Sequence, residues 1–436
     1  MKAVKFLVLA LALFAVMVTM PAQLVRAQEE VTCDSDVVVQ ADDWLSKIAE
    51  KFYGDPLAYP AIAAATNAKA AMDNSYATIS NYDVIEPGWK LCVPSAADAE
   101  VTLSEPVQEL VSLSDLPKPE ISTLSLGFGV DPPFAPHVVA IEKGWFKEAG
   151  FENVETKTFT AGALAGEALA AGEIQLWTPG NVPPISMRHN ALPIVILGTN
   201  SVAYIEHTVV RADAGVTKPE DLYNIRIGLL EGSTASAVLN NLATHYGLDP
   251  SRLQVVNLPP PEQLTSMINN ETQAFVAWQP WPYQASQQMD VVFVNNGRVS
   301  GFPQDKGEQV QTSHTRSVWV ASEDFVRNNP NAASAMMKVL LRAQAYVANP
   351  ANRAEVIRLF SEFQGQSIAD NEAIWDDYSF DPSFGESYVA DMQSYTDFLA
   401  EAGRISNPID PLDYTYTGYV QEFRPNLVTV QGKWQP

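Results

Sequence analysis

The stretch Ile225-Arg-Ile-Gly-Leu-Leu-Glu-Gly-Ser-Thr-Ala-Ser-Ala-Val-Leu239 predicts a buried strand that turns into a helix. Its first six residues are mostly aliphatic, and residues 235–246 have helical composition. Between them, Gly232 permits close approach of the backbone, and Ser233 and Thr234 commonly cap helices. Free amides and the positive end of the helix dipole would make this turn a site for an oxyanion. The alternative is a simple N-cap exposed to water, so the site needs support from the rest of the chain.

The composition is that of a folded protein with an acidic balance. The chain has 436 residues, of which 47% are hydrophobic and 18% charged, and this length predicts more than one domain. Its 27 basic and 51 acidic residues give a net charge of −24. This balance argues against nucleic acid as a partner, because phosphate binding needs a basic face. A local site for a small anion remains compatible with it.

The N-terminus predicts a secretory signal peptide over residues 1–27. Lys2 and Lys5 precede an apolar run at residues 6–18, and residues 25–27 (Val-Arg-Ala) offer small side chains for cleavage. A single membrane anchor is the alternative, but the apolar run is short for a membrane span. We therefore expect a secreted protein of the periplasm or cell wall.

Residues 31–95 predict a small module with the order strand–helix–helix–strand. The expected elements are residues 36–40, 43–53, 58–67 and 84–93. Cys33 and Cys92 are the only cysteines and flank this module. A disulfide between the outer ends of its terminal strands would stabilise a domain whose core is small. Two free buried thiols are the alternative.

The same module resembles the LysM domain. The resemblance is carried by residues 38–55, with Asp-Trp-Leu at 43–45 as a specific part, and by residues 85–94. It implies binding of N-acetylglucosamine polymers such as peptidoglycan, in a groove between two loops. The residues expected in that groove are Asp42, Asp43, Trp44 and Asn81. The sequence departs from the family pattern at two places near this groove. The family usually has Gly where Asp42 stands, and the segment of residues 68–82 is longer than the family's usual segment.

After a linker expected at residues 96–120, the pattern changes to alternating short strands and helices. Such alternation predicts an α/β domain with a largely parallel sheet. The expected strands are residues 124–130, 154–159, 174–177, 192–198, 225–230, 253–258, 274–278, 291–294 and 317–321.

Residues 121 to about 400 resemble the periplasmic solute-binding proteins of ABC importers, in the nitrate/sulfonate/taurine (NMT1/THI5-like) group. Six stretches carry the resemblance in the family's order, at residues 140–150, 168–175, 180–185, 228–236, 275–281 and 318–325. The resemblance implies a two-lobed periplasmic-binding-protein type II fold, with ligand trapped between lobes that close. We place lobe one at residues 121–205 plus 315–436 and lobe two at residues 206–314.

The ligand site is expected beyond the carboxyl ends of the strands, where loops lead into helices. The candidate ligand-binding residues are Asp131, Phe134, His137, Thr160, Gly162, Thr178, Asn181, Gly232, Ser233, Thr234, Trp278 and Trp281. Helix N-termini at Gly162 and Ser233 would hold one anionic head group, and Asn181 would add a neutral donor. The loops contain no Lys or Arg, so dipoles would bind the anion.

Each of these assignments has a structural alternative. The aromatic residues could pack in the core, and His137 could merely cap a helix. Glu231 could oppose an anion, or it could bind a ligand amine, as in an aminosulfonate.

These features predict an exported solute-binding component of an ABC importer. It would capture a small sulfonate-, taurine- or nitrate-like anion, pass it to a membrane permease, and be tethered to peptidoglycan by the LysM module. The alternatives are a pyrimidine-precursor-type binding protein or enzyme of the same fold, and a ligand-sensing subunit. The chain has no His-Glu-x-x-His motif, no cysteine after Cys92 and no spaced His cluster. We therefore expect no catalysis, no metal and no cofactor, and we expect a monomer.

Overall fold

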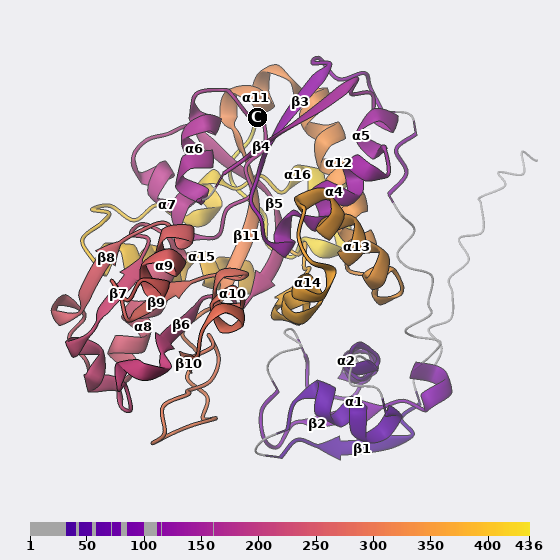
Figure 1. Cartoon of the computed structure of the whole chain (residues 1–436). Helices are drawn as coiled ribbons and strands as arrows, with labels where there is room; N and C mark the ends of the chain where they lie inside the picture. The colour runs from indigo at the N-terminus through magenta and orange to yellow at the C-terminus, as the bar shows by residue number, and fades with distance from the viewer. Residues whose placement is uncertain are drawn as a thin grey trace, which may run out of the picture. The chain divides into compact units, whose positions relative to one another are not determined.

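The computed structural model describes residues 32–40, 43–54, 58–70, 72–79, 85–99, 111–114, 116–159 and 161–436. The predicted signal peptide lies outside these residues, as do the candidate site residues Asp42, Asn81 and Thr160. The chain divides into two compact units, residues 1–106 and 107–436, which are described one at a time (Figure 1). No helix in the described part of the chain combines the length and the apolar character that a membrane crossing requires.

The first unit is a small module with the predicted order of elements. These are β1 (Ser35–Val38), α1 (Leu45–Tyr53), α2 (Tyr59–Ala70) and β2 (Lys90–Val93). The two strands pair antiparallel, with Asp36 opposite Cys92. Aliphatic side chains from both helices and from β2 form the core, among them Leu45, Ile48, Ile62 and Leu91. The predicted disulfide between Cys33 and Cys92 is confirmed.

The first sheet of the second unit is mixed rather than largely parallel. β3 (Thr123–Phe128) and β4 (Asn153–Thr158) form a parallel pair. The longer β5 (Ile194–Ala203) pairs antiparallel with both β11 (Thr315–Ser322) and β12 (Tyr378–Ser379). Residues 174–177, predicted as a strand, form only the isolated bridges Leu126–Leu176 and Trp177–Val320. These bridges connect β3 to β11.

The second sheet has the strand order β10-β6-β9-β7-β8. Its strands are β6 (His207–Arg211), β7 (Arg226–Leu229), β8 (Gln254–Asn257), β9 (Ala274–Ala277) and β10 (Val291–Asn295). β7 is parallel to both β8 and β9, whereas β6 runs antiparallel to β9 and β10. The sequence pattern did not predict β6.

Helices cover both faces of this second sheet. Val210 and Val276 belong to a core with α8 (Thr234–His245). Their neighbours Val209 and Phe275 belong to another core, with α9 (Pro260–Ile268) and α10 (Trp281–Gln288). This division follows because successive side chains of a strand point to opposite faces. The carboxyl ends of the parallel strands β7 and β9 therefore lie at one edge, where α8 and α10 begin.

The remaining helices belong to the part of the unit that contains the first sheet (Figure 1). They are α4 (Ala135–Glu142), α5 (Trp145–Glu148), α6 (Gly162–Ala170), α7 (Val182–His189), α11 (Glu323–Asn328), α12 (Pro330–Val347), α13 (Arg353–Gln364), α14 (Ile368–Ile374), α15 (Glu386–Glu401) and α16 (Gly418–Phe423). Leu113, in the predicted linker, is also buried in this core. The chain crosses between the two sheets twice, at residues 204–206 after β5 and at residues 296–314 before β11.

Candidate ligand-binding site

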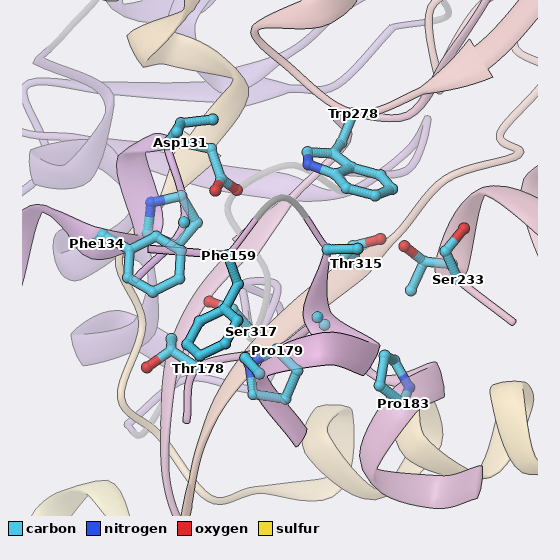
Figure 2. Close-up of a pocket in the computed structure, with 18 of the residues that line it drawn as sticks. Asp131, Phe134, Phe159, Thr178, Pro179, Pro183, Ser233, Trp278, Thr315 and Ser317 are labelled. Atoms are coloured by element: carbon cyan, nitrogen blue, oxygen red, sulfur yellow. The ribbon is translucent and has the colours of Figure 1, made fainter. Parts of the chain in front are cut away.

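A cavity lies between the two sheets, where strand ends meet the two crossing segments. Its volume is about 110 Å³, which suits a small solute, because sites for drug-sized ligands run to roughly 300–1,000 Å³. Seven of the predicted site residues line it: Asp131, Phe134, Gly162, Thr178, Ser233, Thr234 and Trp278. They come from loops and helix starts that are far apart in the sequence, and Figure 2 gives a close-up of the cavity that they line.

Four other predicted residues do not line this cavity. His137 is buried behind it, with its Nε2 atom 3.0 Å from the Oγ1 atom of Thr178. Asn181 is also buried, and its Oδ1 atom accepts a hydrogen bond of 2.7 Å from the backbone N–H of Arg316. Trp281 packs against the core between the second sheet and α9, and Gly232 lines a separate pocket. A direct ligand role for these four stays a prediction without support from their positions.

The turn before α8 has the expected glycine but a different cap. Gly232 has φ of 77°, in the left-handed region that favours glycine. Ser233 occupies the N-cap position, yet its Oγ atom donates a hydrogen bond to the carbonyl oxygen of Leu230 at 2.7 Å. The predicted side-chain cap is therefore absent. Ser233 and Thr234 still place the N-terminal end of α8 beside the cavity.

The sequence interpretation missed Glu206, a buried carboxylate in the first crossing segment. Glu206 is 1% exposed and lines the cavity. Its carboxylate accepts hydrogen bonds from Thr234 Oγ1 at 2.6 Å and from Thr315 Oγ1 at 2.8 Å, and also one from the hydroxyl of Ser313. Glu206 thus joins α8 to both crossing segments. A lone acid inside the largely apolar residues 202–210 was the signal that could have identified it.

Asp131 is a second carboxylate in the same cavity. Although part of its surface remains accessible, desolvation raises the pKa of Asp131 to about 7, and the nearby negative charge of Glu206 contributes to the rise. Figure 2 shows the Asp131 carboxylate pointing into the space between Phe134 and Trp278. Among the described residues that line the cavity, two are acidic and none is Lys, Arg or His.

Aromatic side chains form part of the wall, as predicted for Phe134 and Trp278. Phe134 stacks on Phe128 with ring centroids 5.5 Å apart. Trp278, which directly follows β9, is half-buried beside Ile205. Phe159, which directly follows β4, also lines the cavity and was not predicted. Within the described residues, no group of three or more His, Cys, Asp or Glu side chains is arranged to hold a metal ion.

Comparison with known proteins identifies the family of this chain and several proteins that are similar to it. Residues 131–354, just over half of the chain, match the family model described as NMT1/THI5 like. The taurine-binding periplasmic protein of Escherichia coli (strain K12) is 29% identical over 217 residues, which are 49% of this chain and 63% of that protein. The match therefore spans slightly less than two thirds of that relative.

Solved structures share the fold at low sequence identity. The alkanesulfonate-binding protein SsuA from Xanthomonas axonopodis pv. citri, bound to MOPS, has a TM-score of 0.58 at 16% identity, over 68% of this chain and 99% of that chain. The nitrate-binding protein NrtA from Synechocystis PCC 6803 has a TM-score of 0.59 at 17% identity, over 71% of this chain and 90% of that chain.

An enzyme also has this fold. The desulfurization enzyme DSZB matches with a TM-score of 0.50 at 16% identity, over 70% of this chain and 99% of that chain. By contrast, the relative with 29% sequence identity is named as a binding protein. The chain belongs to the NMT1/THI5-like family and has the mixed α/β fold of periplasmic solute-binding proteins.

Proposed function

We propose that this protein is the exported solute-binding component of an ABC importer. It captures a small sulfonate-, taurine- or nitrate-like solute between its lobes and passes the solute to a membrane permease. The observation that carries this proposal is the small interlobe cavity, which is bordered by the N-terminal ends of α6 and α8. Helix N-termini attract oxyanions because their amides and dipoles point toward the ligand. The names of the similar proteins support the same class of solute.

Calorimetric titration of the full chain with taurine, ethanesulfonate, nitrate and bicarbonate tests this function. We expect one solute molecule per chain and complete recovery of unchanged solute after dialysis. If a folded protein binds none of these solutes, the proposed function is wrong. Chemical conversion of a bound solute would instead favour an enzyme of this fold.

We also propose that the first unit binds peptidoglycan and holds the protein near its permease. Trp44 precedes α1 and is 54% exposed, which is unusual for a large aromatic side chain and suits stacking on a sugar ring. Beside it, the Oδ2 atom of Asp43 accepts a hydrogen bond from the backbone N–H of Gln40 at 2.9 Å. Tethering would raise the local concentration of loaded protein at the membrane.

Co-sedimentation with insoluble peptidoglycan tests this tether. We expect Trp44→Ala to lose most of the binding. Phe52→Ala is a matched control, because Phe52 is an exposed aromatic residue of the same module at the far end of α1. Equal sedimentation of the wild type and Trp44→Ala would contradict a glycan site at Trp44.

A further inference from the structure

We infer that the interlobe cavity selects a solute that carries an ammonium group together with its oxyanion, and that Asp131 and Glu206 bind the ammonium. The inference rests on the proposed function and narrows its ligand class to small zwitterions, of which aminosulfonates are the simplest example. Simple anions such as nitrate, bicarbonate and unsubstituted alkanesulfonates would then be poor ligands.

The charge of the cavity is the first reason. Its described lining contains the carboxyl groups of Asp131 and Glu206 and no basic side chain. Above the pKa of Asp131, a bare anion placed in this cavity would meet two like charges in surroundings where water screens them poorly. A ligand ammonium would instead supply the positive charge that the lining lacks.

The hydrogen bonds of Glu206 are the second reason. Its three protein partners, Thr234, Ser313 and Thr315, are all neutral hydroxyl donors. They fix the orientation of the carboxylate without neutralising it. The N-terminal end of α8 offsets roughly half of one charge, and Thr234 directs that end toward Glu206. With both carboxyl groups ionised, this leaves the charge of Asp131 and about half the charge of Glu206 for the ligand to balance.

The positions of the remaining lining groups give the ligand an orientation. Trp278 and Phe134 flank the Asp131 carboxylate (Figure 2) and offer aromatic faces to a cation. Because Glu206 already uses the end of α8, the end of α6 at Gly162 is the better place for the oxyanion. Thr178 also lines the cavity, and its hydroxyl group, which lies 3.0 Å from the Nε2 atom of His137, can donate to that oxyanion when this Nε2 atom carries the ring proton. One small zwitterion would therefore place its ammonium at Asp131 and its oxyanion at the N-terminal end of α6.

The test compares taurine with ethanesulfonate, which has the same carbon chain and sulfonate but no ammonium. Calorimetry on the wild-type protein should give at least about tenfold tighter binding of taurine, the effect expected of one charge-assisted hydrogen bond. Asp131→Asn and Glu206→Gln keep the size of each side chain and remove its charge. Each should weaken taurine binding about tenfold or more and strengthen ethanesulfonate binding, so that the ratio approaches one.

Several outcomes separate this inference from the proposed function. If ethanesulfonate binds the wild type as tightly as taurine, the inference is wrong while the proposed function stands. The same holds if both folded variants weaken both ligands by equal factors, since that pattern indicates a structural role. If none of taurine, ethanesulfonate, nitrate and bicarbonate binds, the proposed function fails as well. Glu231→Gln, outside the cavity, is the control and should leave the ratio unchanged.

Discussion

Two glutamates near the start of α8 have opposite surroundings. Glu206 is 1% exposed, lines the interlobe cavity and, within the described part of the chain, accepts hydrogen bonds from hydroxyl groups alone. The side chain of Glu231 is 47% exposed and forms an ion pair with Arg404 at 3.5 Å beside a second pocket. An exposed, paired carboxylate is already solvated, whereas a buried one with neutral partners retains charge that a ligand can balance. Burial and the type of partner, more than proximity to a motif, therefore indicate which acid belongs to the site.

The largest expected effect comes from the turn that contains Glu231 and leads to Thr234, the hydrogen-bond partner of Glu206. Ser233→Pro removes the backbone N–H and the hydroxyl group that both bond to the carbonyl oxygen of Leu230. The start of α8 would shift, and Thr234 would lose its contact with Glu206. We expect solute binding to fall more than about 100-fold in calorimetry. Ser233→Ala keeps the backbone and should stay within about threefold of the wild type; comparable losses in both variants would contradict a role for the turn geometry.

The two tryptophans at the end of β9 give a second contrast. Trp278 lines the cavity, whereas Trp281 packs against a core that includes Leu264 and Phe275. We expect Trp278→Ala to weaken solute binding about tenfold through the loss of an aromatic wall. Trp281→Ala should lower the melting temperature and leave the affinity within about threefold. Affinity and thermal melting, measured on both variants, check this assignment, and the reverse pattern would refute it.

The pH dependence of binding should distinguish an ammonium from a bare anion. Asp131 has a pKa of about 7, so between pH 8 and pH 6 it changes from mostly ionised to mostly protonated. A proton competes with a ligand ammonium for the carboxylate. Affinity for taurine should therefore fall by up to about tenfold over this range, while affinity for ethanesulfonate should rise. Calorimetric titrations of both ligands at pH 6, 7 and 8 check the sign.

Other titratable groups near Asp131 determine the control for this experiment. Glu206 faces it across the cavity, and the hydroxyl of Tyr378 has a pKa raised by burial, so it stays neutral. Burial also lowers the pKa of His137 to about 3, which keeps its ring neutral. Asp377, bonded to Gln279, has a pKa raised by burial to about 6 and titrates in the same range. A pH dependence that persists in Asp131→Asn would assign the effect to Asp377 instead.

Local patterns were sufficient to predict much of the fold and part of the site. The Gly232 turn and the strand–helix alternation depend on neighbouring residues, so they are visible in the sequence. β6 was missed because His207 to Arg211 begin directly after Glu206, with no turn residue to mark a new strand. Glu206 was missed for a related reason. Its partners Thr234, Ser313 and Thr315 are 28, 107 and 109 residues away, and only folding brings them together.

At Ser233 the N-cap position was predicted correctly, but the hydrogen bond of its side chain was not. The residue type and spacing predicted a hydroxyl that accepts from helix amides, but the hydroxyl donates backward to Leu230. The strand-to-helix turn is tight enough to offer that carbonyl, and a sequence motif does not distinguish the two bonds. The sequence also could not distinguish Trp278, which lines the cavity, from Trp281, which lies three residues later and packs against a core.

The smallest expected effect belongs to Glu231, and it tests the comparison most directly. Glu231→Gln removes the ion pair with Arg404. This pair connects the turn before α8 to the segment that follows α15. Exposed pairs contribute about 0–1 kcal/mol because water and salt screen them, so affinity for taurine should change by no more than about threefold. Arg404→Ala should give the same small change in calorimetry. A loss of tenfold or more in both variants would mean that this pair, though exposed, contributes to lobe closure, and exposure alone would no longer separate the two glutamates.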